Sequence, residues 1–328
     1  VLTETFSKFA PEGAVVTQAP YPVISYKQAM LEFGTDKPDL RNPLRIVDTT
    51  DFFQRCTFKP FHGKTVRAIK VHADMSKGFH EKLLKFAQSI GMGGLGYLEV
   101  LEDKSYKGPI DKFIPDDMKQ EIADIANLEV GDTIFFIADT EEHAALYAGQ
   151  IRNELGARLD LLEKNAYRFC FINDFPMFEY DKEAKKIIFT HNPFSMPQGG
   201  LEALNTKDPR DILAYQYDIV CNGVELSSGA VRNHNLDIMV KAFEIAGYTE
   251  EDLKEKFGAL YNAFQFGAPP HAGMAPGVDR MIMLLRNEEN IREVIPFPMN
   301  GNAQDVMCGA PNEVSEMQLR EVHIKVRK

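Results

Sequence analysis

Hydrophobic positions recur at two different spacings along the chain, and the change of spacing divides it into three stretches. Within residues 60–157, short apolar runs at 65–71, 97–101 and 133–138 have the pattern of strands. Between and after them, apolar residues return every three or four positions, which is the spacing of one helix face, over residues 79–90, 118–125 and 144–155. This alternation of strands and helices predicts a self-contained α/β unit.

After about residue 158 the pattern favours antiparallel strands. Residues 169–173, 178–180 and 187–191 are predicted to be adjacent strands, and residues 215–221 and 224–231 flank Asn222-Gly223, the dipeptide typical of a tight hairpin turn. Three helices are then predicted: residues 236–246, a helix capped by Thr249 that runs toward Phe266, and a last helix opened by the capping box of Ser315 and Gln318.

The first stretch is rich in turn residues around a short helical pattern at residues 26–33. We therefore predict one α+β domain with an antiparallel sheet, built from residues 1–59 and 158–328 and interrupted by an insertion of residues 60–157. We expect the insertion to fold as a separate unit hinged on its two connections, with few core contacts to the main sheet.

Composition narrows the classes of function. The 328 residues are 44% hydrophobic and 26% charged, as in ordinary globular proteins, and the net charge of -11 provides no overall positive field for nucleic acid. No apolar run approaches the roughly 18 residues of a membrane span, so we expect a cytoplasmic protein with no membrane partner. The chain begins with Val1 rather than Met, which suggests a piece of a longer product.

Residues 91–96 match the dinucleotide-binding pattern G-x-G-x-x-G, but their context is wrong for that function. The pattern binds phosphate only when it follows a strand and opens a helix, whereas here it follows a predicted helix and leads into a predicted strand. We interpret it as a helix end followed by a turn.

The predicted hairpin brings two acidic residues together. With Asn222-Gly223 as its loop, Val220 lies opposite Glu225 and Asp218 opposite Ser227, so the carboxylates of Asp218 and Glu225 share one face. Such a pair suits a hard cation such as Mg²⁺ that also contacts substrate phosphates. The alternative is a solvated outer face with no ligand.

Two further motifs are candidates for anion binding and catalysis. Gly277-Val278-Asp279-Arg280 begins a predicted helix, and a guanidinium beside a helix N-terminus favours phosphate, unless Arg280 pairs with an acidic residue. His191 lies at the end of a predicted strand and precedes Asn192-Pro193, so its ring is expected to face a cleft or solvent, either as a structural or as a catalytic histidine.

Taken together, several strings resemble the bacterial aspartyl-tRNA synthetases, which are class II aminoacyl-tRNA synthetases. They are Tyr26 with GTDKPDLR (34–41), DFPMFEYD (174–181), HNPFS (191–195), YDIVCNGVELSSGAVR (217–232), FGAPPHAGMAPGVDR (266–280) and GAPNEV (309–314). The insertion, with IGMGGLGYLEV (90–100) and Lys112, resembles the GAD domain that these enzymes share with a transamidosome subunit. The resemblance covers essentially the whole chain.

The resemblance implies a class II antiparallel core that forms aspartyl-adenylate from ATP and L-aspartate and transfers the aspartyl group to tRNA(Asp), with tRNA(Asn) as a further possible acceptor. It assigns Arg280 and Glu225 to catalysis and ATP binding, with Gly277 and Asp218 also at ATP, and Asp218 and Glu225 to Mg²⁺. By the same resemblance, Arg232 holds the side-chain carboxylate of aspartate and His191 belongs to a mobile loop.

Members of this family also carry an anticodon-binding domain and two further motifs, one at a homodimer interface and one at the ATP α-phosphate, that have no match here. We therefore expect this chain to be inactive alone. Two alternatives remain: a class II asparagine synthetase that uses ammonia, against which the GAD-like insertion argues, and a tRNA-docking module, which predicts neither the acidic hairpin nor the Arg280 helix.

Strand parity adds one structural expectation. Side chains alternate between the faces of a strand, so Glu225 and Arg232, an odd number of positions apart, should point to opposite faces. The roles implied by the resemblance require both to face one cleft. We therefore predict a β-bulge between them, at residues 227–229, because Gly229 tolerates the backbone angles of a bulge.

Overall fold

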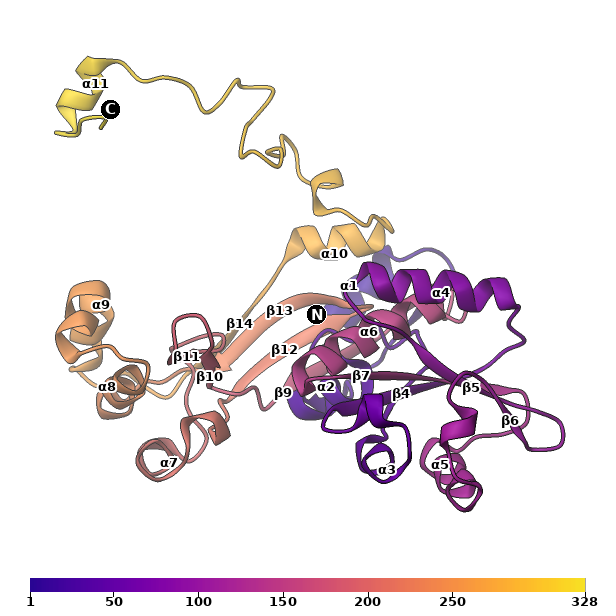
Figure 1. Cartoon of the computed structure of the whole chain (residues 1–328). Helices are drawn as coiled ribbons and strands as arrows, with labels where there is room; N and C mark the ends of the chain where they lie inside the picture. Colours follow the sequence, from indigo (N-terminus) through magenta and orange to yellow (C-terminus); the bar gives the residue numbers. More distant parts are fainter. Residues whose placement is uncertain (328) are drawn as a thin grey trace. The chain divides into compact units, whose positions relative to one another are not determined.

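The computed structural model describes residues 1–327 and contains two compact units, residues 1–276 and the described residues from 277 onward. The first unit holds two five-stranded sheets (Figure 1). The main sheet has the order β14-β13-β12-β9-β2, and its strands are β2 (Val23–Ser25), β9 (Phe169–Asn173), β12 (Gln216–Cys221), β13 (Val224–Val231) and β14 (Ala272–Pro276).

The main sheet is built around the β12–β13 hairpin. Asn222 and Gly223 form its turn with φ angles of 50° and 84°, the left-handed conformation that this dipeptide favours. β12 also pairs antiparallel with β9, and β13 with β14, so the predicted antiparallel sheet is confirmed. The exception is the parallel pair β2–β9. The chain that connects these two strands contains the whole insertion, which is long enough for the crossover that a parallel pair needs.

Helix α2 (Tyr26–Phe33) covers part of this sheet, with the bounds predicted from the sequence. The side chain of Ser25 caps its N-terminus by accepting a hydrogen bond from the amide of Gln28. On its inner face, Ala29 and Phe33 pack in one apolar cluster with residues of β2, β9 and β12. This packing fixes where the chain leaves α2, which becomes important at the site.

The other elements of the first unit outside the insertion are helices and short strands, and one expected pairing is wrong. Residues 169–173 were expected beside 178–180, but β9 is already bonded to β12 and β2 on its two edges, so β10 and β11 pair only with each other. These remaining elements are α1 (Leu2–Phe9), β1 (Val15–Val16), β8 (Ala166–Tyr167), β10 (Phe178–Asp181), β11 (Lys186–Phe189), α7 (Gly200–Thr206), α8 (Leu236–Ile245) and α9 (Glu250–Phe264).

The insertion alternates strands and helices as predicted, yet each pair in its sheet is antiparallel. The strand order β3-β4-β7-β5-β6 places β7 between β4 and β5, so these two strands, which α4 connects, are not neighbours. The elements are β3 (Ile46–Asp48), α3 (Thr50–Arg55), β4 (Thr65–His72), α4 (Lys77–Ser89), β5 (Gly96–Val100), β6 (Tyr106–Lys107), α5 (Lys119–Ala126), β7 (Asp132–Asp139) and α6 (Glu141–Arg158).

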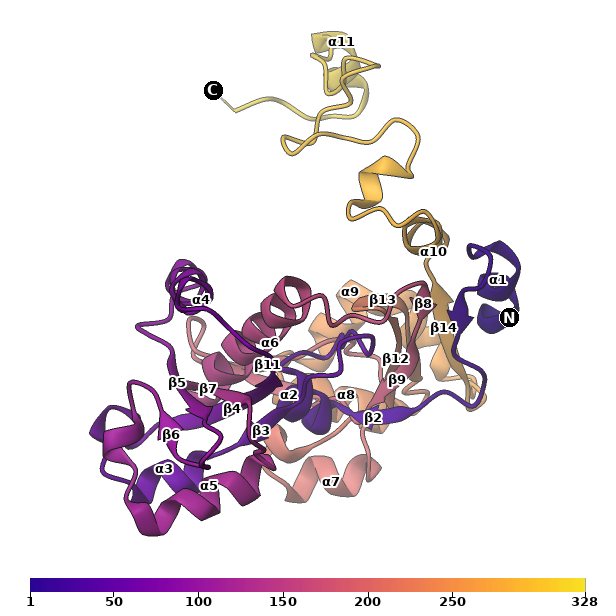
Figure 2. The ribbon, with the colours of Figure 1, turned by 90° about the vertical axis from the view of Figure 1, so that its right-hand side faces the viewer.

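Helices cover both faces of the insertion sheet. Helices α3 and α5 lie on one face and α4 and α6 on the other (Figure 2). Successive residues of β7 alternate between the two cores, so Phe136 packs with α3 and α5 while Phe135 packs with α4 and α6. Since β3 and α3 belong to this layered unit, the insertion begins before residue 60, where the sequence pattern had suggested its boundary.

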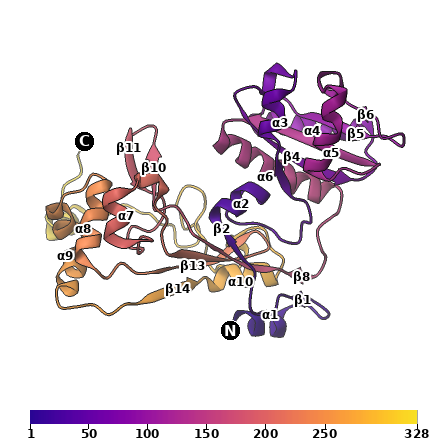
Figure 3. The same ribbon diagram turned by 90° about the horizontal axis from the view of Figure 1, so that it is seen from below.

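The insertion also contacts the main domain, through its helix α6. Helix α6 lies beside the C-terminus of α2 (Figure 3), where a Cβ on Gly149 would lie 2.8 Å from the carbonyl oxygen of Gly34. As expected, β7 does not pair into the main sheet. The two sheets therefore have separate cores joined through α2 and α6.

The second unit contains α10 (Val278–Leu285) and α11 (Glu316–Glu321). The predicted capping box of Ser315 and Gln318 is present at α11, as is that of Thr249 with Asp252 at α9. Between residues 277 and 327, Met283 is the one buried residue. Across residues 1–327, no helix combines the length and the apolar character needed to cross a bilayer.

Candidate active site

The two acidic residues of the hairpin lie on one face of the main sheet. Val220 pairs with Glu225, as expected, whereas Asp218 pairs with Ser228 instead of Ser227. Residues that pair directly across antiparallel strands share a face, so the carboxylates of Asp218 and Glu225 project to the same side. Asp218 is 3% exposed, and Glu225 is half-buried.

A β-bulge changes the pairing between these two positions. Val220 pairs with Glu225 and Ile219 with Ser227, so Leu226 is the extra residue. The predicted bulge is thus confirmed, but it lies at Leu226 and not within residues 227–229. Alternate positions from Ser228 lead to Arg232, directly after β13, and place it on the face of Asp218.

The environment of Asp218 favours a cation. Burial raises the pKa of its carboxyl to about 6; the hydrogen bond of Ser228 lowers it, while the charge of Glu225 raises it further. Its Oδ1 atom is buried without a hydrogen-bond partner among the described residues. A buried carboxylate oxygen in this state is costly unless a cation or donor reaches it.

These donors fit Mg²⁺, which prefers carboxylate oxygens and keeps several positions for water and phosphate. Among residues 1–327 there is no group of three or more His, Cys, Asp or Glu side chains that could hold a metal ion. Asp218 and Glu225 would therefore supply two protein ligands, and substrate and water oxygens would supply the others.

Lys37 and Asp36 also lie at the site, on the loop after α2. Neither residue was predicted from the sequence to have a role there. The ammonium of Lys37 lies 2.6 Å from Asp36 Oδ2 and 3.5 Å from Glu225 Oε2. Burial lowers the pKa of Lys37, but the hydrogen bond and charge of Asp36 and the charges of Glu225 and Asp218 outweigh it, so the pKa is raised. The string 34–41, which contains both residues, is part of the family resemblance and was the signal that could have pointed to them.

His191 lies near the same charges. The predicted strand 187–191 ends earlier, because β11 stops at Phe189 and His191 lies two residues beyond it. The exposed ring of His191 packs edge-on against Phe175 with a centroid distance of 5.0 Å. Desolvation on the packed side lowers its pKa, while the charges of Asp36 and Glu225 act in the opposite direction. The ring is therefore mostly neutral near pH 7.

Gly277 and Arg280 belong to the second unit. Gly277 is the N-cap residue of α10, and Arg280 lies in its first turn, as the sequence predicted. The guanidinium is exposed and close to the positive end of the helix dipole, an arrangement that suits an anion.

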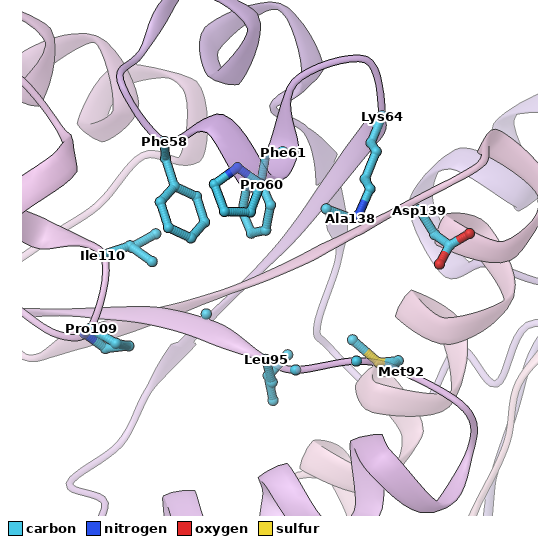
Figure 4. A pocket seen from close by; sticks show the side chains of 13 residues that line it. Phe58, Pro60, Phe61, Lys64, Met92, Leu95, Pro109, Ile110, Ala138 and Asp139 are labelled. Carbon is cyan, nitrogen blue, oxygen red and sulfur yellow. The ribbon is translucent and has the colours of Figure 1, made fainter.

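A separate cavity of about 400 Å³ lies in the insertion (Figure 4). Phe58, Phe61 and Ile110 line one part of it, and Gly93, Gly94 and Gly96 of the 91–96 motif line another. This loop follows α4 and leads into β5, as predicted, so it is not a dinucleotide fingerprint. Neither Asp218 nor Glu225 borders the cavity, which is therefore distinct from the acidic site.

Comparisons with known proteins agree with the sequence resemblance. Residues 1–301 match the family model described as tRNA synthetases class II (D, K and N). The chain is 51% identical to an aspartate--tRNA(Asp/Asn) ligase of Ehrlichia canis over 335 residues, covering 100% of this chain and 56% of the relative. It is also 51% identical to an aspartate--tRNA ligase of Streptomyces avermitilis over 330 residues, with the same two coverages.

Among solved structures, the aspartyl tRNA synthetase from Entamoeba histolytica is 19% identical, with a TM-score of 0.32, and the match covers 74% of this chain and 44% of that one. The chain thus spans little more than half the length of the curated relatives that it matches. The family match covers most of the chain and agrees with the strings in the main domain and in Gly277–Arg280. This chain belongs to the class II tRNA synthetases of the aspartate, lysine and asparagine group.

Proposed function

We propose that this chain carries part of the catalytic apparatus of an aspartate–tRNA ligase. In the first step, a carboxylate oxygen of L-aspartate attacks the α-phosphorus of ATP, and diphosphate leaves as aspartyl-adenylate forms. In the second step, a hydroxyl of the terminal adenosine of tRNA attacks the aspartyl carbonyl, and AMP leaves.

The observation that carries this proposal is the buried carboxylate of Asp218 beside Glu225 on the hairpin, with one oxygen that has no hydrogen-bond partner among residues 1–327. Bound Mg²⁺ would supply charge neutralisation for the ATP phosphates. The two carboxylates would hold that ion, and Lys37 would keep Glu225 in place. A lone buried acid with no ligand would instead weaken the fold.

The other residues act on the substrates. Arg232 would hold the side-chain carboxylate of aspartate through paired N–H···O bonds, and His191 would close over the amino acid. Arg280, beside Gly277 at the start of α10, would hold the γ-phosphate of ATP. The bulge at Leu226 supports the role of Arg232, because parity then puts it on the face of Asp218.

The isolated 328-residue polypeptide is expected to be inactive, since the resemblance provides no arginine here for the ATP α-phosphate. We propose that the longer protein is a cytoplasmic homodimer that charges tRNA(Asp). The relative named aspartate--tRNA(Asp/Asn) ligase and the one named aspartate--tRNA ligase have the same sequence identity to this chain. Charging assays should therefore include tRNA(Asn) as well as tRNA(Asp).

Aspartate-dependent exchange of diphosphate into ATP tests the proposal, with this chain compared with one extended to the length of its relatives. We expect exchange only in the extended protein, and Asp218→Asn or Glu225→Gln should lower it by about 100-fold or more. Glu202→Gln, an exposed acid on α7, serves as the control and should have little effect. Robust exchange by the 328-residue chain would overturn the expectation that it is inactive alone.

Charging assays separate the ligase from the ammonia-dependent alternative. The extended protein should form aspartyl-tRNA and should not release asparagine when ammonia replaces tRNA. Arg232→Leu should raise the KM for aspartate far more than that for ATP, because the lost contact is to the amino acid. Equal increases in both constants would argue against Arg232 as the aspartate clamp.

A further inference from the structure

Arg152 on α6 of the insertion is a fully buried arginine, with 0% of its surface exposed. Its guanidinium donates hydrogen bonds to three main-chain carbonyl oxygens of one segment: Nε to Leu44 at 2.8 Å, and Nη2 to Asn42 at 2.8 Å and to Asp39 at 3.0 Å. The side chain of Asn42 returns a hydrogen bond to the carbonyl of Arg152 at 2.9 Å. One helical side chain thus holds the chain between Asp39 and Leu44.

The surroundings of Arg152 make this contact specific. Its guanidinium lies over the ring of Phe33, 5.0 Å from the centroid, so α2 contributes to the same pocket. Burial lowers the pKa of Arg152 to about 10, which still leaves it charged at neutral pH. A buried charge held by carbonyl dipoles is costly to leave unpaired, so the segment cannot move away without a penalty.

The face of α6 around Arg152 is shaped for close approach. Gly149 and Gly156 lie three positions before and four after it, on the same side of the helix. A Cβ on Gly149 would lie 2.8 Å from Gly34 O, and one on Gly156 would lie 2.4 Å from Asn42 Nδ2. The helix therefore fits against both ends of the 34–44 segment.

The same segment reaches the acidic site. Lys37 precedes the buried Pro38 and bridges Asp36 and Glu225 with its ammonium. The hairpin turn packs against this stretch, since a Cβ on Gly223 would lie 3.6 Å from Asp39 Cβ and 3.8 Å from Lys37 O. Asp39 is thus held by Arg152 through its carbonyl on one side and touches the hairpin on the other.

We propose that Arg152 is a positioning residue through which the insertion sets the active site: it fixes the 36–44 segment so that the Lys37 ammonium stays beside Glu225. The part of this inference that concerns ATP rests on the proposed function. The insertion then contributes to adenylate formation without touching a substrate.

The first experiment needs no catalytic activity. Amide hydrogen exchange in this chain should become at least about tenfold faster over residues 36–44 in Arg152→Met, while amides of β4 and β7 keep their rates. Arg158→Met is the matched control, because Arg158 lies on the same helix and forms an exposed ion pair with Glu154 on the surface of that helix. Unchanged exchange over 36–44 in Arg152→Met would overturn the proposal.

The second experiment is a double-mutant cycle in the extended protein, with aspartate-dependent diphosphate exchange as the readout. Arg152→Met and Lys37→Met should each lower kcat/KM for ATP by about tenfold, and the double variant should lose no more than either alone. Arg152→Lys, which keeps the charge without the planar fork, should recover only part of the loss and guards against a Met variant that fails to fold.

The outcomes separate the two proposals. Multiplicative losses in the double variant would overturn the link between Arg152 and Lys37, because they would show independent effects on the fold and on the site. If the wild-type extended protein shows no aspartate-dependent exchange of diphosphate, the proposed function fails, and the hydrogen-exchange result alone then decides whether Arg152 positions the segment.

Discussion

Asp218 carries a stability cost that a ligand site can explain. Its pKa in the folded protein is raised from 3.8 to about 6, chiefly by burial, so between these values the folded state binds more protons than the unfolded state. The free energy of unfolding therefore falls as pH rises through this window and stays low above it. The rise corresponds to at most about 3 kcal/mol.

The first prediction follows from that sign. In metal-free buffer, Asp218→Asn should be more stable than the wild type by about 2 kcal/mol at pH 7.5, and the difference should vanish near pH 4. Urea unfolding at both pH values measures it. Asp211→Asn, an exposed control, should change stability by less than about 0.5 kcal/mol at either pH. An Asp218→Asn protein no more stable than the wild type at pH 7.5 would contradict the inference that the buried carboxylate destabilises the fold.

Gly229 is required for close packing and not for the bulge to which its sequence context had assigned it. A Cβ there would lie 2.5 Å from Tyr217 Cε2 and 2.7 Å from the carbonyl oxygen of Gly273. Its pairing with Tyr217 and Met274 is regular. The strand therefore needs a residue without a side chain at the point where β14 and Tyr217 close over it.

The second prediction is that Gly229→Ala lowers the free energy of unfolding by about 1–3 kcal/mol, because neighbouring backbone has to shift. The control is Gly258→Ala within α9, where a Cβ meets no atom within 4 Å and better helix propensity should be neutral or slightly stabilising. Chemical denaturation of both variants checks the difference. Equal stability of the two variants would refute the tight contact.

At the residue scale, the sequence alone could predict the acidic pair but not its lysine. Asp218 and Glu225 are neighbours through a short hairpin whose turn signal is strong, so their common face follows from local rules. Lys37 reaches Glu225 from a loop separated from it by the whole insertion. No periodic pattern records a contact over such a separation.

At the scale of elements, the bulge was predicted only because the proposed roles of Glu225 and Arg232 require both side chains to face one cleft. Parity required one extra residue between Glu225 and Arg232, and the structure contains it. Its position at Leu226 was not predictable from glycine, because a bulge of this kind does not need positive φ, and the described backbone shows none at Leu226. The burial of Leu226, at 1% exposed, indicates that packing fixes the shift.

The two capping boxes give the third prediction. Thr249 caps α9, which buries Leu253 and Tyr261 in a cluster with α8, so Thr249→Ala should lower global stability by about 1 kcal/mol. Ser315 caps α11 in the same way, but no residue of α11 is buried. Ser315→Ala should therefore leave the midpoint of thermal unfolding unchanged. A larger effect at Ser315 than at Thr249 would mean that packing of α11 contributes to the main transition.

At the scale of the molecule, the layers of the insertion were easier to predict than the contact between the insertion and the main domain. The alternating pattern revealed a separate α/β-type insertion, and its two apolar faces are those on which the helices pack. The contact of α6 with α2 depends on Gly149 and Gly34, and sequence patterns treat glycine as a helix breaker or cap, not as a packing surface. The sequence patterns therefore did not predict this contact between the insertion and α2.

The close contact between α6 and α2 leads to the last prediction. Since the backbones of Gly34 and Gly149 are pressed together, residues 1–276 should unfold in one main calorimetric transition despite their two sheets. Gly149→Val should force α6 away from α2 and split this transition into two, with the insertion and the main sheet unfolding at different temperatures. Gly78→Val is the control: Gly78 is an exposed residue in the first turn of α4, where a Cβ would meet no atom closer than 3.8 Å, and the change should lower the stability of the insertion slightly without splitting the transition. A wild-type chain that already shows two well-separated transitions would mean that the α2–α6 contact does not couple the sheets, and that the insertion is the independent unit its sequence pattern suggested.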